Sequence, residues 1–327
     1  MLANHAAARK HLLRPNGAGA TAHVSHSARF LCGLPLFSPF PATAGAAPGA
    51  GLAASLVSAR AGRFLWAMNA SAPLAPAHQR TRGSAEVALV GGRVQRLYTA
   101  GSAKAICLPG EVVFLNTSGG LTGGDRLDYR LDSDAAITAT TQTAERAYRA
   151  ADGIARVTVN LSIGQGRLDW LPQETILFDR CALHRRTRIA LAPEAEVLVL
   201  EAVVLGRAAM GETLSALDFR DRREILRAGT PLLLEPLHLS PETLGRPATL
   251  RGERAFASLA LVAQGAEDAL APVRQVLDEP GVRGAASGFD GKLTLRLLAA
   301  DGWPLRRQIA RVLAVLRDRP LPRVWQI

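Results

Sequence analysis

The most informative stretch of this sequence is Asn116-Thr117-Ser118-Gly119-Gly120-Leu121-Thr122-Gly123-Gly124-Asp125-Arg126-Leu127. Its two glycine pairs indicate a tight turn of the main chain, because glycine adopts backbone angles that other residues avoid. An apolar run at 112–115 precedes the turn, and residues 127–132 alternate between apolar and charged side chains. The pattern predicts a strand, a glycine turn and a half-buried strand.

Asp125 follows the glycine turn directly, at a point where backbone can approach its carboxylate closely. Two interpretations are open. In the first, the stretch is a hairpin loop with an ordinary surface aspartate, since most loops only connect elements. In the second, the loop and its carboxylate belong to a functional site, because loops also carry much of protein function.

Short strand patterns dominate the chain beyond Ser84. Residues 157–163 alternate cleanly between apolar and polar side chains, and Pro172 ends a further strand because proline cannot donate to an interior ladder. The expected strands are 86–94, 105–108, 137–143, 157–163, 168–172, 186–191, 195–205, 248–250, 255–263 and 292–298. Strands at a spacing of about 8–12 residues predict a mainly β fold, as a sandwich, a barrel or a solenoid.

Helical patterns occur only near the C-terminus. Residues 266–277 and 303–317 each carry apolar side chains at helical spacing. The second pattern is the stronger, because Asp301 can cap the helix and Pro304 suits its first turn. We therefore expect about two helices after a long series of strands.

The charge of the chain is concentrated at its N-terminus. The 327 residues have a formal net charge of +11, and residues 1–67 contain six Arg or Lys and no acid, which leaves about +5 for the rest. A nucleic-acid groove needs clustered Lys and Arg with interleaved aromatic residues, and no such run occurs. Nucleic acid is therefore not an expected partner.

Cysteine content and hydropathy indicate the compartment. The three cysteines, Cys32, Cys107 and Cys181, are scattered, which excludes a disulfide framework and a paired-cysteine zinc site. This usage fits the reducing cytoplasm. No apolar run reaches the roughly 18 residues that a membrane span needs, so no membrane association is expected.

Residues 1–67 do not have the composition of a folded domain. Residues 42–54 consist almost entirely of Ala, Gly, Pro and Thr, and such low complexity offers little to pack. The basic, acid-free composition is also typical of an organellar transit peptide. We favour a disordered or artefactual extension, with the start codon at either Met1 or Met68, and expect the folded β domain at 84–327.

Three further motifs follow the glycine loop. Residues 140–149 place an acid and two arginines after a threonine-rich strand, and residues 170–179 set Glu174 and Asp179 around an apolar centre. Residues 201–218 contain a third motif built on Gly206, Arg207 and Gly211.

In this order the motifs resemble those of the urease accessory protein D family, also called UreD or UreH. The glycine loop is matched by 118–125, with serine where the family has proline, and the other motifs by 140–149, 171–179, 206–212 and 322–325. The resemblance covers residues 84–327. The matched motif residues are Gly119, Gly120, Gly123, Gly124, Thr140, Thr141, Tyr148, Arg149, Pro172, Gln173, Asp179, Gly206, Arg207 and Gly211.

The resemblance implies a fold and a role. Members of this family are mainly β, with two sheets wound into an irregular β-helix-like body and about two helices toward the C-terminus. They are non-catalytic chaperones that bind the urease apoprotein, act with the accessory proteins F and G, and help to insert nickel. No tightly bound cofactor is implied, and Ni²⁺ would be present only transiently. An isolated subunit with an exposed apolar interface is also expected to aggregate.

The residues agree with a protein that is not an enzyme. The glycine loop lacks the lysine of a phosphate-binding loop, and no nucleophile elbow of the Gly-x-Ser-x-Gly type occurs. The alternative function is a β-rich hydrolase with Glu174 and Asp179 as its acid pair. Five residues apart on an extended strand, these side chains would point to opposite faces, which weakens that alternative.

Carboxylates are the expected nickel ligands. Oxygen donors bind Ni²⁺ less tightly than imidazole or thiolate, as a protein that passes the ion on requires. Our hypothesis is a polar internal passage lined by some of Asp125, Glu145, Glu174 and Glu212. In the alternative interpretation the same residues are structural acids paired with Arg126, Arg146, Arg149 and Arg207.

Overall fold

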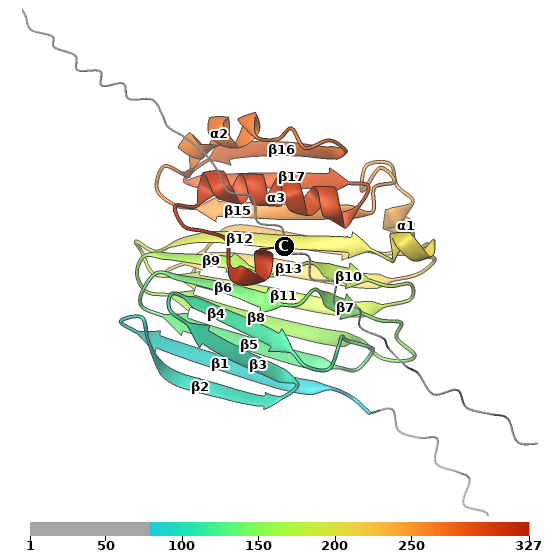
Figure 1. The fold of residues 1–327 in the computed structure, drawn as a ribbon, viewed down its shortest axis with the longest axis horizontal. Coiled ribbons are helices and arrows are strands. Elements are labelled where there is room, and N and C mark those ends of the chain that lie inside the picture. Colours follow the sequence, from blue (N-terminus) through green and yellow to red (C-terminus); the bar gives the residue numbers. More distant parts are fainter. Residues whose placement is uncertain (1–78, 327) are drawn as a thin grey trace, which may run out of the picture. The chain divides into compact units, whose positions relative to one another are not determined.

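The structure, a computed structural model, describes residues 79–326. The expectations for residues 1–67, including the choice between Met1 and Met68, lie outside these residues. The described part contains seventeen strands, three α-helices and three short 3-10 helices (Figure 1). Its strands form two sheets and no closed barrel, which confirms the mainly β fold. None of its helices is long and apolar enough to span a membrane.

The first sheet has seven strands. Its five central strands are all parallel, and the strand at each edge is antiparallel to its neighbour. The spatial order is β14 (Thr230–Leu239), β13 (Asp218–Arg227), β11 (Ala182–Leu191), β8 (Ala155–Ile163), β5 (Arg126–Ser133), β1 (Arg82–Val90) and β2 (Arg93–Gly101).

The second sheet has ten strands. The main path is β16 (Val282–Phe289), β17 (Lys292–Ala299), β15 (Ala255–Val262), β12 (Glu196–Leu205), β9 (Arg167–Leu171), β6 (Ile137–Gln142), β4 (Glu111–Asn116) and β3 (Ala103–Leu108). Two short strands, β7 (Glu145–Ala147) and β10 (Thr175–Leu177), pair with each other, and β10 also pairs with β12.

The chain winds alternately through the two sheets. From β4 to β13 it passes to β5, back to β6, on to β8, back to β9, on to β11 and back to β12. Each turn therefore adds one strand to each sheet beside the strand of the turn before, and the added strands are parallel. This is the irregular β-helix-like winding that the family resemblance implies.

The main core lies between the two sheets. The alternating residues of β8 place Val157, Val159 and Leu161 in this core, as their pattern predicts. The aromatic rings of Phe114, Tyr129 and Trp170 meet there, with ring centroids 5.0 and 6.3 Å from Phe114. Packing of such rings adds to the stabilisation from burying their area.

A second core lies between the ten-stranded sheet and the C-terminal helices. The helix α3 (Gly302–Leu316) runs along this sheet (Figure 1) and buries Leu305, Ile309, Val312, Leu313 and Leu316. Asp301 caps it by accepting a hydrogen bond from the Gly302 N–H. The shorter α2 (Leu270–Gln275) follows the 3-10 turn η2 (Ala266–Ala269). Both predicted helices are thus present.

The remaining short helices lie in connections. The one-turn helix α1 (Pro241–Leu244) follows β14, and the 3-10 turn η1 (Ala208–Met210) follows β12. The 3-10 turn η3 (Arg323–Trp325) ends the described chain and buries Trp325 against the second core.

Some strand predictions were wrong. Residues 248–250 form a turn, and the strand predicted at 86–94 ends at Val90, where Gly91 and Gly92 turn the chain into β2. The predictions also missed β13, β14 and β16, most of β2, and the short β7 and β10. β13 places Asp221 and Arg223 on its inward face, which hides the apolar alternation that marks a strand.

The hairpin interpretation of the glycine loop was also wrong. The strand before the loop, β4, lies in the ten-stranded sheet, and the strand after it, β5, lies in the seven-stranded sheet. The loop therefore crosses between sheets. Asp125 is 3% exposed, so it is not a surface aspartate.

Candidate functional site

Four loops that carry the recognised motifs meet at one end of the sandwich. They are residues 117–125, 143–154, 172–181 and 206–217, and each leads the chain from the ten-stranded to the seven-stranded sheet. We call this end the crossover end. It collects motifs that lie far apart in the sequence because each turn of the winding crosses at the same place.

Backbone hydrogen bonds join successive loops of the crossover end. The Leu121 N–H donates to the Arg146 carbonyl at 2.7 Å, which joins the first two loops. The Ala150 N–H donates to the Arg180 carbonyl at 3.0 Å, and the Arg180 N–H donates to the Ala216 carbonyl at 2.7 Å. The four loops are therefore stacked as one unit and are not independent surface segments.

The glycine loop fits tightly against its neighbour. Gly120 has φ +145°, and an added Cβ would lie 2.4 Å from the ring of Tyr148 and 2.7 Å from the carbonyl oxygen of Arg146. No side chain can occupy that space. The Tyr148 ring in turn packs against Phe178, with centroids 4.9 Å apart. Glycine is thus required here for close packing of the loops.

Other motif residues hold strands and loops in register. The Thr140 hydroxyl donates to the Leu171 carbonyl at 2.6 Å, and the Thr141 hydroxyl accepts from the Gln173 N–H at 2.9 Å. The Arg149 carbonyl accepts from a hydroxyl of the glycine loop at 2.8 Å. These motif residues therefore hold neighbouring strands and loops together.

Asp125 anchors the end of the glycine loop. Its Oδ1 accepts from the Thr81 N–H at 2.7 Å and its Oδ2 from the Thr122 N–H at 2.8 Å. Both carboxylate oxygens are thereby used by backbone donors, an arrangement that satisfies a buried charge. The structure does not place this carboxylate on an internal cavity.

Glu212 and Asp179 hold the fourth loop. Glu212 forms an ion pair with Arg207 at 2.8 Å and accepts from the Asp179 N–H at 3.1 Å. The Asp179 carboxylate accepts from the N–H groups of Ser215 at 2.6 Å and Ala216 at 3.1 Å. Although burial acts in the opposite direction, these hydrogen bonds hold the pKa of Asp179 below its usual value.

Glu174 forms an ion pair on the helix-covered side of the ten-stranded sheet. Its carboxylate pairs with Arg306 of α3 at 3.2 Å. Asp179 is bound by the loop at 206–217, so the two carboxylates are held by different elements. The geometry therefore gives no support to a hydrolase that uses them as an acid pair.

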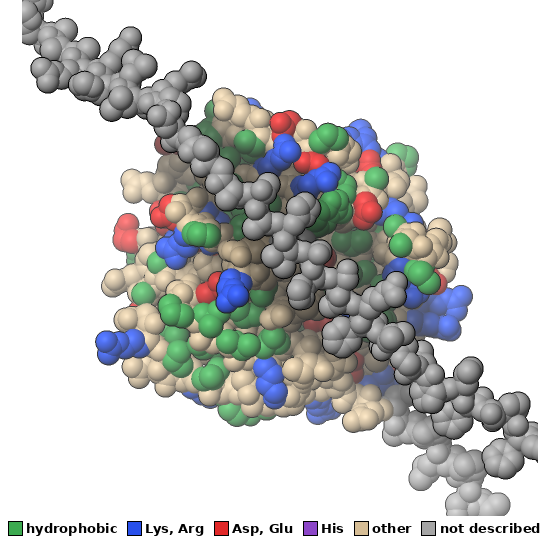
Figure 2. All heavy atoms as spheres, viewed as in Figure 1, with side chains coloured by type: hydrophobic (Ala, Val, Ile, Leu, Met, Phe, Trp, Pro, Cys, Tyr) green, Lys and Arg blue, Asp and Glu red, His purple; other side chains and the backbone are tan. Residues whose placement is uncertain are grey.

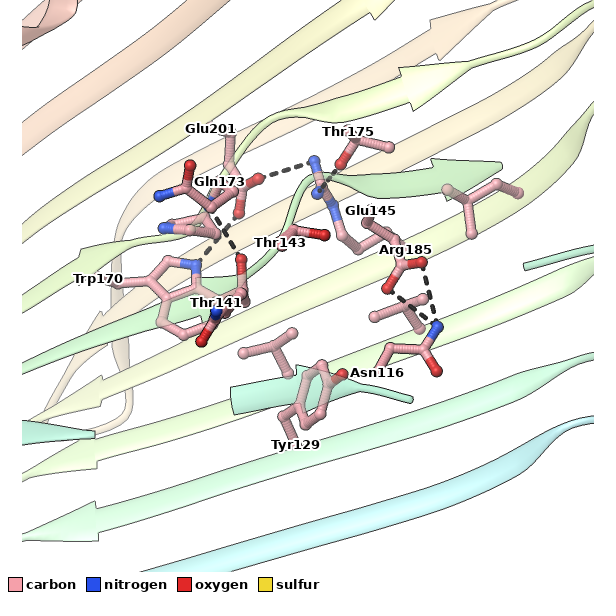
Figure 3. Close-up of a pocket in the computed structure, with 15 residues that line it drawn as sticks. Asn116, Tyr129, Thr141, Thr143, Glu145, Trp170, Gln173, Thr175, Arg185 and Glu201 are labelled. Carbon is pink, nitrogen blue, oxygen red and sulfur yellow. Dashed lines mark hydrogen bonds and ion pairs between the residues drawn. The ribbon is translucent and has the colours of Figure 1, made fainter. Parts of the chain in front are cut away.

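Glu145 alone among the four predicted nickel ligands lines an internal cavity (Figure 3). The cavity lies between the sheets and measures about 40 Å³, room for roughly three waters at about 10–15 Å³ each. Asn116 Nδ2 donates to both Glu145 oxygens, at 3.1 and 3.3 Å. Burial raises the pKa of Glu145 to about 7, with the Asn116 hydrogen bond opposing the rise.

Arg185 faces the same cavity and is fully surrounded by partners. Its guanidinium forms ion pairs with Glu201 and Asp221, each at 2.9 Å, and donates to the Thr175 hydroxyl at 3.0 Å. Glu201 also accepts from Trp170 Nε1 at 3.2 Å. Figure 3 shows these side chains converging from separate strands on one interior space.

Charged residues continue from this cavity to a second one. Arg223 pairs with Glu235 at 3.3 Å, Arg296 also pairs with Glu235, and the Ser258 hydroxyl lies 3.2 Å from a Glu235 oxygen. The second cavity measures about 330 Å³ and is lined by all four of these side chains. We call the whole set the interior polar band. Its members are Glu145, Arg185, Glu201, Asp221, Arg223 and Glu235, with Arg296 at its solvent-exposed end.

Sequence reasoning missed most of the interior polar band. The available signal was a charged residue at an inward position of a strand, such as Arg185 between Leu183 and Thr187. The described residues hold no group of three His, Cys, Asp or Glu side chains arranged to bind a metal ion. The site is thus a set of paired charges around small cavities, without a preformed metal centre.

Comparison with known proteins identifies relatives over the described region. The family described as UreD urease accessory protein matches residues 70–326. The urease accessory protein UreD of Cereibacter sphaeroides (strain ATCC 17025 / ATH 2.4.3) is 59% identical over 275 residues, which are 79% of this chain and 100% of the relative. That of Paracoccus denitrificans (strain Pd 1222) is 53% identical over 261 residues, 76% of this chain and 93% of the relative. That of Rhizobium leguminosarum bv. trifolii (strain WSM2304) is 44% identical over 275 residues, 80% of this chain and 100% of the relative.

Proposed function

The chain belongs to the UreD family of urease accessory proteins, and from that premise we propose that it acts as a metallochaperone and scaffold for nickel insertion into apo-urease. It works in the cytoplasm, in a complex with the accessory proteins F and G and the urease apoprotein. It catalyses no reaction and holds no resident cofactor, so nickel is its cargo.

The observation that carries the nickel part of this proposal is the placement of Glu145. Its carboxylate lines a cavity large enough for a few waters and is held by a neutral amide group. Its pKa near 7 means that proton and cation compete for the carboxylate at the pH of the cytoplasm. A single oxygen ligand of this kind holds Ni²⁺ weakly and releases it readily.

The other predicted nickel ligands have structural roles in this proposal. Asp125 and Glu212 hold the loops of the crossover end, and Glu174 ties α3 to the ten-stranded sheet. Glu201 joins Glu145 on the wall of the cavity. Because Glu201 is already bound by Arg185 and Trp170, we assign the contact with the ion to Glu145 and assign the supporting structure to the remaining acids.

The experiment replaces the chromosomal copy by Glu145→Gln and measures nickel per purified urease. Glutamine keeps the size of the side chain and removes the charge, so nickel content is expected to fall about tenfold. Co-purification of the F protein and apo-urease must remain intact. The matched control is Glu86→Gln, which removes the β1 carboxylate of a surface ion pair with Arg96 of β2 and should leave nickel loading unchanged.

Two results would contradict the proposal at different levels. Normal nickel loading of urease by Glu145→Gln in an intact complex would show that this carboxylate is not needed for nickel transfer. Fully metallated urease in cells that lack this protein would show that the protein is not required for urease maturation.

A further inference from the structure

The seven-stranded sheet presents an outer face that carries many charged side chains. The core side chains of β5 and β8 face the other sheet, so the alternate residues point away from it. The two C-terminal helices pack on the ten-stranded sheet and do not cover this face. Its outward side chains are exposed or half-buried among the described residues.

The strand register places a row of arginines and histidines across this face. Arg82 pairs with Arg126, and Arg126 pairs with Arg156, on the neighbouring parallel strands β1, β5 and β8. The row continues on the next three strands through His184, Arg220 and His238. Neighbouring strands lie about 4.8 Å apart, so four arginines and two histidines follow one another at that spacing.

One half of the row is neutralised within the protein. Asp218 interacts with His184 at 2.8 Å, His238 at 3.1 Å and Arg220 at 3.1 Å. This carboxylate also has a pKa below its usual value: burial opposes the shift, and the hydrogen bonds from His184 and Arg220 produce it. The β11–β14 end of the row therefore has an internal counter-charge.

The other half has no carboxylate within ion-pair distance in the described residues. Arg82, Arg126 and Arg156 are exposed and form no ion pair or side-chain hydrogen bond there. Asp128, two residues after Arg126 on the same face, forms no ion pair either. We call Arg82, Arg126 and Arg156 the arginine row.

Like charges directly opposite each other destabilise a sheet. The arginine row therefore lowers the stability of the folded protein. A partner that supplies negative charge would relieve the repulsion among the three arginines. Guanidinium groups bind carboxylates through two parallel hydrogen bonds, so a carboxylate-rich surface is the best-matched partner. Bases of nucleic acid would need aromatic side chains for stacking, and the row contains none.

The arginine row also adjoins the crossover end. Arg126 directly follows Asp125, which ends the glycine loop, and the Arg156 N–H donates to the Asp125 carbonyl at 2.8 Å. A partner seated on the row would therefore touch the loops that carry the recognised motifs. The charged face and the crossover end form one continuous surface.

We propose that the arginine row is the docking site for an acidic protein surface on a partner of this chain. The choice of partners to test, apo-urease and the F protein, rests on the proposed function. The docking contact itself depends only on the charge and register of the three arginines. It acts mainly on the rate of association, as complementary charge does at other interfaces.

The test uses the double variant Arg126→Gln/Arg156→Gln in the full chain. Association with purified apo-urease and with purified F protein is measured at 50 and 500 mM NaCl. We expect one partner to associate about tenfold more slowly with the variant at 50 mM, and the difference to vanish at 500 mM because salt screens the charges. A polyglutamate peptide should compete with that partner on the wild-type chain only.

The matched control is Arg246→Gln/Arg251→Gln, which removes the same charge from exposed loop arginines remote from the row in sequence. Its association rates should equal those of the wild type. The row variant should also unfold at an equal or higher temperature than the wild type, since like-charge repulsion is removed. Arginines with a structural role would instead lower that temperature when replaced.

The outcomes separate this inference from the proposed function. If the wild type binds neither partner, the proposed function fails. If the wild type binds and the row variant binds equally fast at both salt concentrations, the docking inference fails alone. If only binding of a DNA or RNA oligonucleotide is lost in the row variant, the surface recognises nucleic acid and the protein-docking assignment is overturned.

Discussion

The variant Glu145→Gln is predicted to change how the free energy of unfolding depends on pH. Burial raises the pKa of Glu145 to about 7, well above the ordinary value of 4.5. Between these two values the folded chain holds a proton on Glu145 that the unfolded chain has released. The stability contributed by the protonated form is thus complete below about pH 4.5 and is lost as the pH rises to 7.

The size of this loss follows from the shift. Each pKa unit corresponds to about 1.4 kcal/mol, so the shift from 4.5 to about 7 corresponds to about 3 kcal/mol. Glu145 is half-buried and solvent screens part of this effect, so we expect about 1–3 kcal/mol. Glutamine has no charge to desolvate and still offers an oxygen to the Asn116 amide.

The assay is urea unfolding of the wild type and the variant at pH 5 and at pH 8. At pH 5 the two proteins should have nearly equal free energies of unfolding. At pH 8 the variant should be more stable by about 1–3 kcal/mol. The difference between the proteins isolates Glu145, because all other titrating groups are common to both.

A constant stability difference at both pH values would refute this reasoning, because it would show that Glu145 titrates alike in the folded and unfolded chains. A variant less stable than the wild type at pH 8 would show that the ionised carboxylate is favoured inside the protein. Either result would also remove the competition between proton and cation on which the proposed role of Glu145 depends.

Three further changes test the fold. Gly120→Ala should lower the free energy of unfolding by about 2–4 kcal/mol in urea titrations, whereas Gly119→Ala, at a positive φ with open space around it, should cost about 1 kcal/mol. Arg317→Ala should cost about 1–3 kcal/mol because buried Asp169 loses one of its two arginine partners and keeps only Arg167, and the exposed Arg319→Ala should cost under about 0.5 kcal/mol. Leu97→Lys on the edge strand β2 should reduce aggregation of the isolated chain in light scattering without changing its thermal unfolding.

The last of these changes follows from a second exposed surface. Large apolar side chains remain exposed on the first three strands, among them Leu97, Tyr98, Ile106 and Leu108. Figure 2 shows hydrophobic side chains gathered on the face over β3 and β4. An edge strand of this kind invites pairing with another chain. This agrees with the expectation that the isolated subunit aggregates, which stays a prediction.

Local patterns sufficed for much of the secondary structure. The alternation at Val157–Leu161 predicted β8 and its inward face, and the stripe from Ile309 to Leu316 predicted α3. These predictions succeeded because each element buries one face against a core, which leaves a period of two or 3.6 residues in the sequence. They failed for β13, where Asp221 and Arg223 occupy inward positions that apolar residues normally hold.

Of the four predicted nickel ligands, only Glu145 lies where a motif and a strand position coincide. Asp125, Glu174 and Glu212 resembled Glu145 in the sequence, since each is an acid within a motif that also holds small residues. In the structure three of them are bound by the loops or by α3, and one faces a cavity. Nothing local distinguishes them, because the direction of a side chain depends on which strands lie beside it.

By itself the sequence determined the strand-rich character of the chain, the two C-terminal helices, the need for glycine at the crossings and membership of one family. These properties depend on residue type and spacing along a single segment. Tertiary structure alone decided that Asn116, Glu145, Arg185 and Glu201 share one interior space, and that three arginines line up on the opposite face. The physical reason is the winding: each turn returns the chain to the same edge, so charges distant in sequence become neighbours across strands.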